Sequence, residues 1–212
     1  MHSHKVILGQ SPWLEIATED WLQVQPGLSI QSVEVVLDRS HGFELSSVLD
    51  GLDPATTTGF VAWGSKFLNF QRLELMGELK KRGFKMPALV HPSAQVSPSA
   101  TCQENVWIQA QAVVGPQVAI GLNVHVGIGA RLGFRSQVGN SVWLGQDVRL
   151  GAQARVEAHA VLGDGVLAAE GVRIGRQACI EAAGPISLDW PDKAFRLRDS
   201  GLEGMIIEHR LR

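Results

Sequence analysis

The stretch VGPQVAIGLNVHVGIGARLGFRSQVGNSVWLG, residues 114–145, decides the fold, because an apolar residue returns at every sixth position through it. The period runs without a break from Val90 to Ile186. Such a fixed internal period is the mark of a stacked repeat, and six does not match the spacing of an amphipathic helix. The seventeen anchors are Val90, Val96, Cys102, Ile108, Val114, Ile120, Val126, Leu132, Val138, Leu144, Leu150, Val156, Leu162, Ala168, Ile174, Ile180 and Ile186.

A second register accompanies the anchors. A small residue stands four places after each anchor. Glycine often follows the anchor directly, as at Gly115, Gly121 and Gly127. Each hexad is therefore expected to be a short strand and a turn, with the glycine taking backbone angles that a β-carbon would resist. Three hexads make one triangular coil of eighteen residues, so seventeen anchors predict five to six coils of a parallel β-helix.

Residues 1–86 lack the hexad and predict a small α/β domain. Strands are expected at residues 5–9, 32–37 and 59–64. Helices are expected at residues 12–23, with Ser11 as N-cap, and at residues 69–82. This order favours a parallel sheet that binds ligands at the carboxyl ends of its strands. The β-helix is expected at residues 87–187, and a tail at 188–212 is expected to cover its last coil through residues 205–207.

The bulk composition disfavours several partners. The net charge is −2 and no basic cluster exceeds residues 80–82, which argues against nucleic acid. No apolar run is long enough to span a bilayer or to form the core of a signal peptide. Cys102 is an inward anchor and Cys179 an outward position, so no disulfide is expected and a reducing cytoplasm fits.

The layout resembles the hexapeptide-repeat acyltransferases with a left-handed β-helix, above all the sialic-acid O-acetyltransferase and bacillosamine N-acetyltransferase group. The resemblance covers residues 5–186 and rests on the hexads, the strand–glycine start at 6–9, the turn at 62–65 and the HPSA sequence at 91–94. It implies a homotrimer with active sites between subunits. It also implies a sugar or nucleotide sugar as acceptor, acetyl-CoA as co-substrate and a role in surface-glycan biosynthesis.

The resemblance implies site residues as well, and no metal. Asp38 either holds a ribose or sugar hydroxyl or caps a turn. Arg72 either pairs with a phosphate or is a surface charge of its helix. Arg135 either pairs with a phosphate or carboxylate or is a solvated turn residue. The residues implied for the sugar are Gly9, Gln10, Ser11, Asp38, Gly64, Arg72, Arg135 and Trp143. Those implied for acetyl-CoA are Gly145, Gly163, Gly165, Ala169, Gly171 and Gly175.

The sequence departs from the family at the residues that matter most for catalysis. The family's general base is a histidine between two acidic residues, and the aligned hexad here reads LGFRS, residues 132–136. The base position is therefore Phe134, which has no lone pair and cannot take a proton. A second family histidine falls at Trp143, and the glycine-rich turn of the sugar site reads GQSPW, residues 9–13.

His125 is the best candidate for a relocated base. Residues eighteen apart stack on one face, which places His125 between Trp107 and Trp143. Two indoles would desolvate its imidazole and favour the neutral, basic form. The alternative is that this column is an outward aromatic surface that packs against the next subunit.

Two main functions follow. The first is an acyl-CoA-dependent transferase that uses His125 or mainly the proximity of its substrates. The second is a non-catalytic trimer that binds a sugar or a protein through an exposed Trp107 and Trp143. A carbonic anhydrase of the γ type on the same helix is a weak third, because His91, His125 and His159 do not lie in one suitable cluster.

Overall fold

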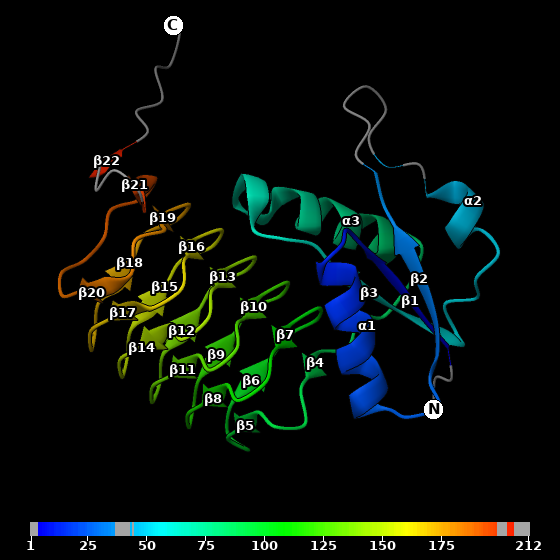
Figure 1. Cartoon of the computed structure of the whole chain (residues 1–212), viewed down its shortest axis with the longest axis horizontal. Helices are drawn as coiled ribbons and strands as arrows, with labels where there is room; N and C mark the ends of the chain where they lie inside the picture. Colours follow the sequence, from blue (N-terminus) through cyan, green and yellow to red (C-terminus); the bar gives the residue numbers. More distant parts are fainter. Residues whose placement is uncertain (1–3, 37–42, 44, 199–202, 206–212) are drawn as a thin grey trace, which may run out of the picture.

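The computed structural model describes residues 4–36, 43, 45–198 and 203–205, so the predictions for Asp38, Ile206 and Ile207 fall outside the described residues. A small α/β unit, here called the N-terminal unit, lies beside one end of a long parallel β-helix (Figure 1). This is the predicted architecture, a left-handed β-helix of about six turns preceded by a small sheet. None of the helices in the described part of the chain has the length and apolar character needed to cross a bilayer.

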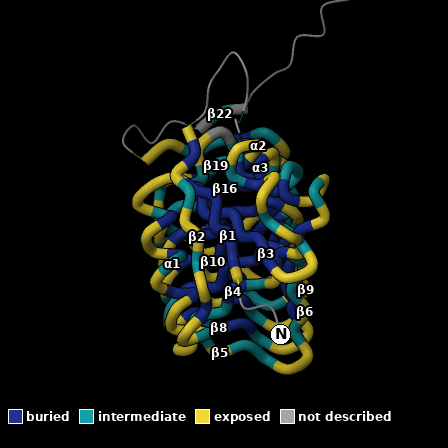
Figure 2. The backbone as a smooth tube through the Cα atoms, turned by 90° about the vertical axis from the view of Figure 1, so that its right-hand side faces the viewer, coloured by how far each residue is buried: buried dark blue, intermediate teal, exposed yellow. Residues whose placement is uncertain are grey.

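The N-terminal unit is a three-stranded parallel sheet in the order β2-β1-β3. Alternation along β1 gives it two apolar faces: Val6 and Leu8 pack with α3, and Ile7 packs with α1. In Figure 2 the central strand β1 is buried, whereas the edge strand β2 is largely exposed. The elements are β1 (His4–Gly9), α1 (Trp13–Val24), β2 (Ser29–Glu34), α2 (Ser46–Leu49), β3 (Thr57–Ala62), η1 (Lys66–Asn69) and α3 (Phe70–Lys81).

The predicted elements of this unit are all present, with shifted ends. The second strand begins at Ser29 rather than Ser32, because all six residues of β2 pair in parallel with the six of β1. The first helix begins at Trp13, and Ser11 does not cap it: Pro12 stands at the N-cap position with no side-chain hydrogen bond. The Ser11–Pro12 peptide bond is cis.

The β-helix has three faces, each a parallel sheet of two- or three-residue strands. The first face contains β4 (Leu89–Val90), β7 (Trp107–Ile108), β10 (His125–Val126), β13 (Trp143–Leu144), β16 (Val161–Leu162), β19 (Cys179–Ile180), β21 (Ala194–Arg196) and the antiparallel β22 (Glu203–Met205). The second contains β5 (Gln95–Val96), β8 (Val113–Val114), β11 (Arg131–Leu132), β14 (Arg149–Leu150), β17 (Val166–Ala168) and β20 (Gly184–Ile186). The third contains β6 (Thr101–Cys102), β9 (Ala119–Ile120), β12 (Gln137–Val138), β15 (Arg155–Val156) and β18 (Arg173–Ile174).

The anchors and the small residues fill one continuous core along the β-helix axis. The glycines after the anchors have a different role from the predicted one. The left-handed backbone angles lie two residues later, as at Gln117, Asn123 and Arg135. Glycine is needed after the anchor because a β-carbon on Gly127 would lie 2.6 Å from the carbonyl carbon of Gly145 in the next coil.

The described part of the tail continues the stack beyond Ile186. β21 pairs in parallel with β19 on the first face, and Trp190 forms a bridge with Ile174 of β18. The tail therefore covers the last coil as expected, but residues 190–196 do so, whereas the expectation had named residues 205–207.

Candidate functional site

The predicted sugar site lies at the carboxyl edge of the N-terminal sheet. Gly9 ends β1, and a β-carbon there would lie 2.2 Å from the carbonyl oxygen of Ala62 in β3. The Gln10 N–H donates to that same carbonyl at 3.1 Å, and the side chains of Gln10 and Ser11 are exposed. The backbone turn is thus kept by close packing against β3, and the two side chains remain available to a ligand.

Trp13 fills the space in front of this edge. Its Nε1 lies 2.7 Å from the place where a β-carbon on Gly64 would stand. On its other side, the Trp13 ring meets Trp143 edge-on, with ring centroids 4.8 Å apart. The indole therefore occupies the gap between the N-terminal unit and the first face of the β-helix, close to both Gly64 and Trp143.

His125 lies inside a closed aromatic cluster. Its ring stacks on Trp143 with centroids 3.7 Å apart and meets Trp107 edge-on at 5.3 Å. Trp13 covers the cluster from the N-terminal unit, with its ring centroid 5.5 Å from that of His125. The Trp107 Nε1–H donates at 2.9 Å to Oδ2 of Asp20, which ties α1 to the first face.

Two predictions about this column are therefore wrong. Trp107 and Trp143 are buried rather than exposed, with 0% and 6% of their surface accessible. The column packs against α1 of its own chain and not against a neighbouring subunit. The physical reason is that α1 carries its own large apolar residues, such as Trp13 and Leu14, toward the first face.

The prediction that His125 is desolvated holds. It is 2% exposed, and burial lowers the pKa of its imidazole well below the usual value. Its Nδ1 lies 3.1 Å from the carbonyl oxygen of Leu144, and its Nε2 is buried with no hydrogen-bond partner among the described residues. The imidazole is neutral, but the surrounding rings keep it away from an incoming substrate.

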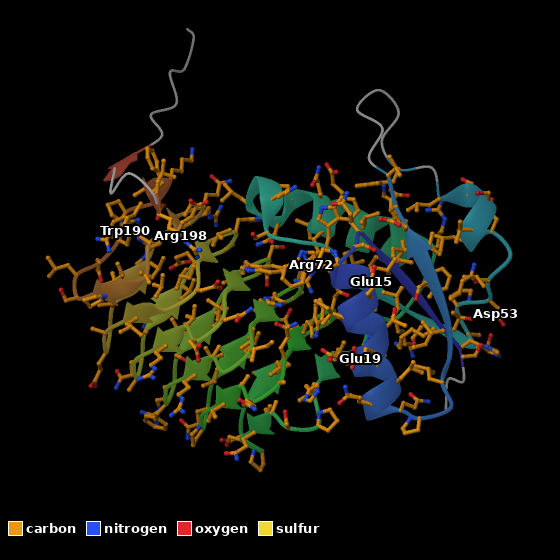
Figure 3. The ribbon with its side chains drawn as sticks, viewed as in Figure 1. Glu15, Glu19, Asp53, Arg72, Trp190 and Arg198 are labelled. Carbon is orange, nitrogen blue, oxygen red and sulfur yellow. The ribbon has the colours of Figure 1, made fainter. Side chains whose placement is uncertain are left out.

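Arg72 joins the two parts of the chain. It is fully buried, and its guanidinium donates to the carbonyl oxygens of Val61 (3.3 Å), Asn105 (3.0 Å) and Asn123 (2.9 Å). Burial lowers its pKa to about 9. Both alternatives considered for Arg72 are wrong: it is neither a surface charge nor open to a phosphate, because backbone carbonyls take its donors. Figure 3 labels it at the junction of the N-terminal unit and the β-helix.

A column of polar corner residues completes this junction, and its members Asn105 and Asn123 were not singled out by the sequence analysis. Asn105 Nδ2 donates to Asn123 Oδ1 at 2.9 Å, and Asn123 Nδ2 donates to Ser141 Oγ at 3.1 Å. Asn69 Nδ2 in turn donates to the Ser141 carbonyl at 2.8 Å. The available signal was the recurrence of polar residues at eighteen-residue spacing. His159 continues the column and stacks on Phe70, with centroids 4.3 Å apart.

Phe134 occupies the corner between the second and third faces and is 40% exposed. The guanidinium of Arg135 lies 4.7 Å from its ring centroid, and Arg135 Nε donates to Gln117 Oε1 at 2.7 Å. Gly133 has no room for the acidic residue of the family, since a β-carbon there would lie 2.8 Å from the Leu150 carbonyl. The corner is open to a ligand and carries the positive charge of Arg135. None of the side chains of Phe134, Arg135 and Gln117 can act as a general base there.

Several of the glycines predicted for acetyl-CoA are required by the fold itself. A β-carbon on Gly145, Gly163 or Gly175 would lie 2.4–2.8 Å from an atom of the following coil. Gly165 and Gly171 take the left-handed backbone at φ +71°. Ala169 is exposed beside Gly171. Coil stacking and backbone angles thus account for these glycines, and their role toward a cofactor stays a prediction.

The described residues contain no group of three or more His, Cys, Asp or Glu side chains that is arranged to hold a metal ion. His91 accepts the Ser93 N–H at Nδ1 over 3.1 Å, and His159 Nδ1 lies 3.1 Å from the Leu68 carbonyl. His125 is enclosed by indoles, so His91, His125 and His159 each have a separate local partner and do not converge on one point.

This fold was compared with protein families and with solved structures. The family described as the GMPPB C-terminal domain matches residues 84–183, the repeat region. No curated protein sequence matches the chain significantly. Among solved structures, PerB from Caulobacter crescentus, in complex with CoA and GDP-perosamine, matches with a TM-score of 0.66 and 24% identity over 95% of this chain and 97% of that one.

Two further structures match over nearly the whole chain. A histidine variant of GDP-perosamine N-acetyltransferase from Caulobacter crescentus has a TM-score of 0.60 and 25% identity, covering 95% of this chain and 96% of that one. The acetyltransferase domain of PglB from Neisseria gonorrhoeae has a TM-score of 0.62 and 23% identity, covering 91% and 95%. The chain therefore shares the two-part fold of these structures, in which the match includes both the N-terminal unit and the β-helix.

Proposed function

We propose that the protein is an acetyl-CoA-dependent transferase that acetylates an amino sugar carried on a nucleotide, in surface-glycan biosynthesis in the cytoplasm. The observation that carries the proposal is the match to GDP-perosamine N-acetyltransferase over 95% of this chain and 96% of that one, because it includes both the N-terminal unit and the β-helix. A protein that had kept only a stacking scaffold would need no N-terminal unit of this form.

The reaction needs little from the protein when the acceptor is an amine. The neutral nitrogen attacks the thioester carbonyl carbon, the C–N bond forms, the C–S bond breaks, and CoA leaves as its thiolate. The proton released from nitrogen passes to the thiolate or to water. Holding the amine against the thioester supplies much of the rate, since well-oriented reactants reach effective molarities of roughly 10⁵–10⁸ M.

The proposed assignment of residues follows the geometry. Gly9, Gln10 and Ser11 line the acceptor side, with Trp143 and Gly64 behind Trp13. Arg135 at the open corner offers a cation beside Phe134. The glycine positions from Gly145 to Gly175 present backbone along the later coils, where acetyl-CoA is proposed to lie between two copies of a homotrimer.

The burial of His125 argues against its service as the general base. A base must come within hydrogen-bond reach of the proton it removes. Nε2 of His125 is enclosed by Trp13, Trp107 and Trp143. We therefore favour catalysis by proximity with a neutral amine as acceptor.

A second candidate function rests on Phe134. An exposed phenyl ring at the corner where the family keeps its base is also what a non-catalytic trimer would show, with Trp13 filling part of the sugar site. Such a protein would bind a sugar or a protein partner and transfer nothing.

Calorimetric titration with acetyl-CoA, and then with CoA, separates the two candidates. Binding in the micromolar range, followed by acetylation of a nucleotide-linked amino sugar detected by mass spectrometry, supports the transferase. Absence of binding at millimolar acetyl-CoA rejects it and leaves the non-catalytic trimer.

A further inference from the structure

The second face of the β-helix carries two arginines in register. Arg131 of β11 and Arg149 of β14 are Cα partners on neighbouring coils, and both side chains are exposed. Adjacent strands lie about 4.8 Å apart. Like charges placed directly opposite each other destabilise a sheet, so this pair has a cost that the rest of the structure must offset.

Nothing in the described part of the chain neutralises the pair. Neither Arg131 nor Arg149 makes a hydrogen bond or an ion pair with a described residue. The outward positions of this face carry no acid; they are Gln95, Val113, Arg131, Arg149, Leu167 and Pro185. Two acids lie at the neighbouring corner. Asp164 is engaged by Arg198 at 3.7 Å and by the Gln146 N–H at 2.9 Å. Asp147, two residues before Arg149, is exposed and forms no ion pair with either arginine.

The third face shows how the same chain handles a similar pair. Arg155 and Arg173 are also Cα partners on neighbouring coils. There Arg173 is neutralised by Glu157 at 3.2 Å and by Asp192 at 2.8 Å. The second face stacks Arg131 on Arg149 without carboxylates placed in this way.

The surroundings of the pair add apolar contact area. Ile128 and Phe134 lie on the same coil as Arg131, at the two ends of its strand, and are 42% and 40% exposed. Leu167, the register partner of Arg149, is 38% exposed. We call Ile128, Arg131, Phe134, Arg135, Arg149 and Leu167 the arginine patch. β11 and β14 lie in the middle of the second face (Figure 1).

We propose that the arginine patch binds the diphosphate of a nucleotide. Guanidinium groups match phosphate oxygens with paired hydrogen bonds, and a flat ring such as that of Phe134 suits a base or another planar group. None of the six residues of the arginine patch is acidic, whereas three are arginines, which favours an anion over a cation. The choice of ligand rests on the proposed function, since CoA and a nucleotide sugar each carry a diphosphate.

The test uses the full chain with both arginines changed, Arg131→Gln with Arg149→Gln. The matched control is Arg155→Gln, which removes one exposed arginine from the neighbouring face. Calorimetry with CoA, GDP and inorganic pyrophosphate, at low and high salt, measures each affinity. Each lost charge-assisted hydrogen bond is expected to weaken binding roughly tenfold or more. The control is expected to change binding less than about twofold.

The outcomes separate this inference from the proposed function. Loss of CoA binding alone assigns the patch to the cofactor, and loss of GDP binding alone assigns it to the nucleotide sugar. If the wild type binds none of the probes, or the double variant binds all of them equally well, the inference is wrong whether or not acetyl transfer occurs. If the double variant keeps all binding but sediments at a lower mass, the patch is a contact between copies and the inference is again wrong. Arginine-dependent phosphate binding without any acetyl transfer supports the patch and rejects the transferase.

Discussion

Arg72 Nη1 donates a hydrogen bond of 2.9 Å to the carbonyl oxygen of Asn123, which joins α3 of the N-terminal unit to a corner of the β-helix. Its other donors reach the carbonyls of Val61 and Asn105, one on each side of the same junction. A pKa lowered to about 9 leaves the guanidinium protonated at neutral pH. One buried charge therefore fixes the relative position of the sheet edge and the aromatic cluster.

Arg72→Leu is expected to lower the free energy of unfolding by about 3–5 kcal/mol, because it removes three buried hydrogen bonds and leaves the carbonyls of Asn105 and Asn123 without this donor. Urea unfolding followed by tryptophan fluorescence measures the loss. The control is Arg82→Leu at the end of the same helix, where a partly exposed ion pair with Glu78 contributes less than about 1 kcal/mol. Equal losses in the two variants would contradict the role given to Arg72.

His125 is expected to make the protein less stable in mild acid. The pKa of His125 in the folded state lies well below the usual value of 6.5. Below pH 6.5 the imidazole is therefore protonated in the unfolded chain while it stays neutral in the folded one. Stability contributed by this group is present above pH 6.5 and falls by up to about 1.4 kcal/mol for each pH unit below it. His125→Phe keeps a ring in the stack and removes the titration.

Urea midpoints of the wild type and His125→Phe at pH 7.5 and pH 5.0 test this expectation. The difference in unfolding free energy between the two proteins should shift in favour of the variant as the pH falls. An unchanged difference between the two pH values would show that His125 takes up its proton in the folded protein as readily as in the unfolded chain.

The β-helix was predictable because its signal is repeated. Seventeen anchors at one spacing leave a single register, so the faces and the inward residues follow from counting. The role of glycine was misjudged because spacing shows where a residue recurs but not which neighbour limits its size. Only the three-dimensional structure shows that Gly127 is required by the backbone of Gly145.

The site was less predictable because it depends on contacts between segments distant in sequence. Counting by eighteen correctly placed His125 between Trp107 and Trp143. It could not show that Trp13, over a hundred residues earlier, closes the cluster. The same limit explains Arg72, whose partners Val61, Asn105 and Asn123 come from β3 and from two coils of the β-helix.

Phe134→His is expected to raise acetyl transfer at least about tenfold if the open corner is the reaction site, because it places a general base there. The position is 40% exposed, so an imidazole is accommodated without repacking. The rate with a nucleotide-linked amino sugar, measured between pH 6 and pH 9, should acquire a dependence on a group that titrates near pH 6.5. Phe134→Leu serves as the control, and an equal rate in both variants would place the chemistry elsewhere.

Two glycine-to-alanine changes are expected to have opposite signs. Gly77 lies inside α3 with no atom within 4 Å of an added β-carbon, so Gly77→Ala should raise the free energy of unfolding by about 0.5–1 kcal/mol through helix propensity.

Gly127→Ala would bring a β-carbon within 2.6 Å of the Gly145 carbonyl and should lower the free energy of unfolding by about 2 kcal/mol or more, because rigid backbone has to shift. Urea midpoints at constant slope measure both changes. A neutral Gly127→Ala would mean that neighbouring coils can separate at little cost, which would contradict the stacking explanation for the glycine in each hexad.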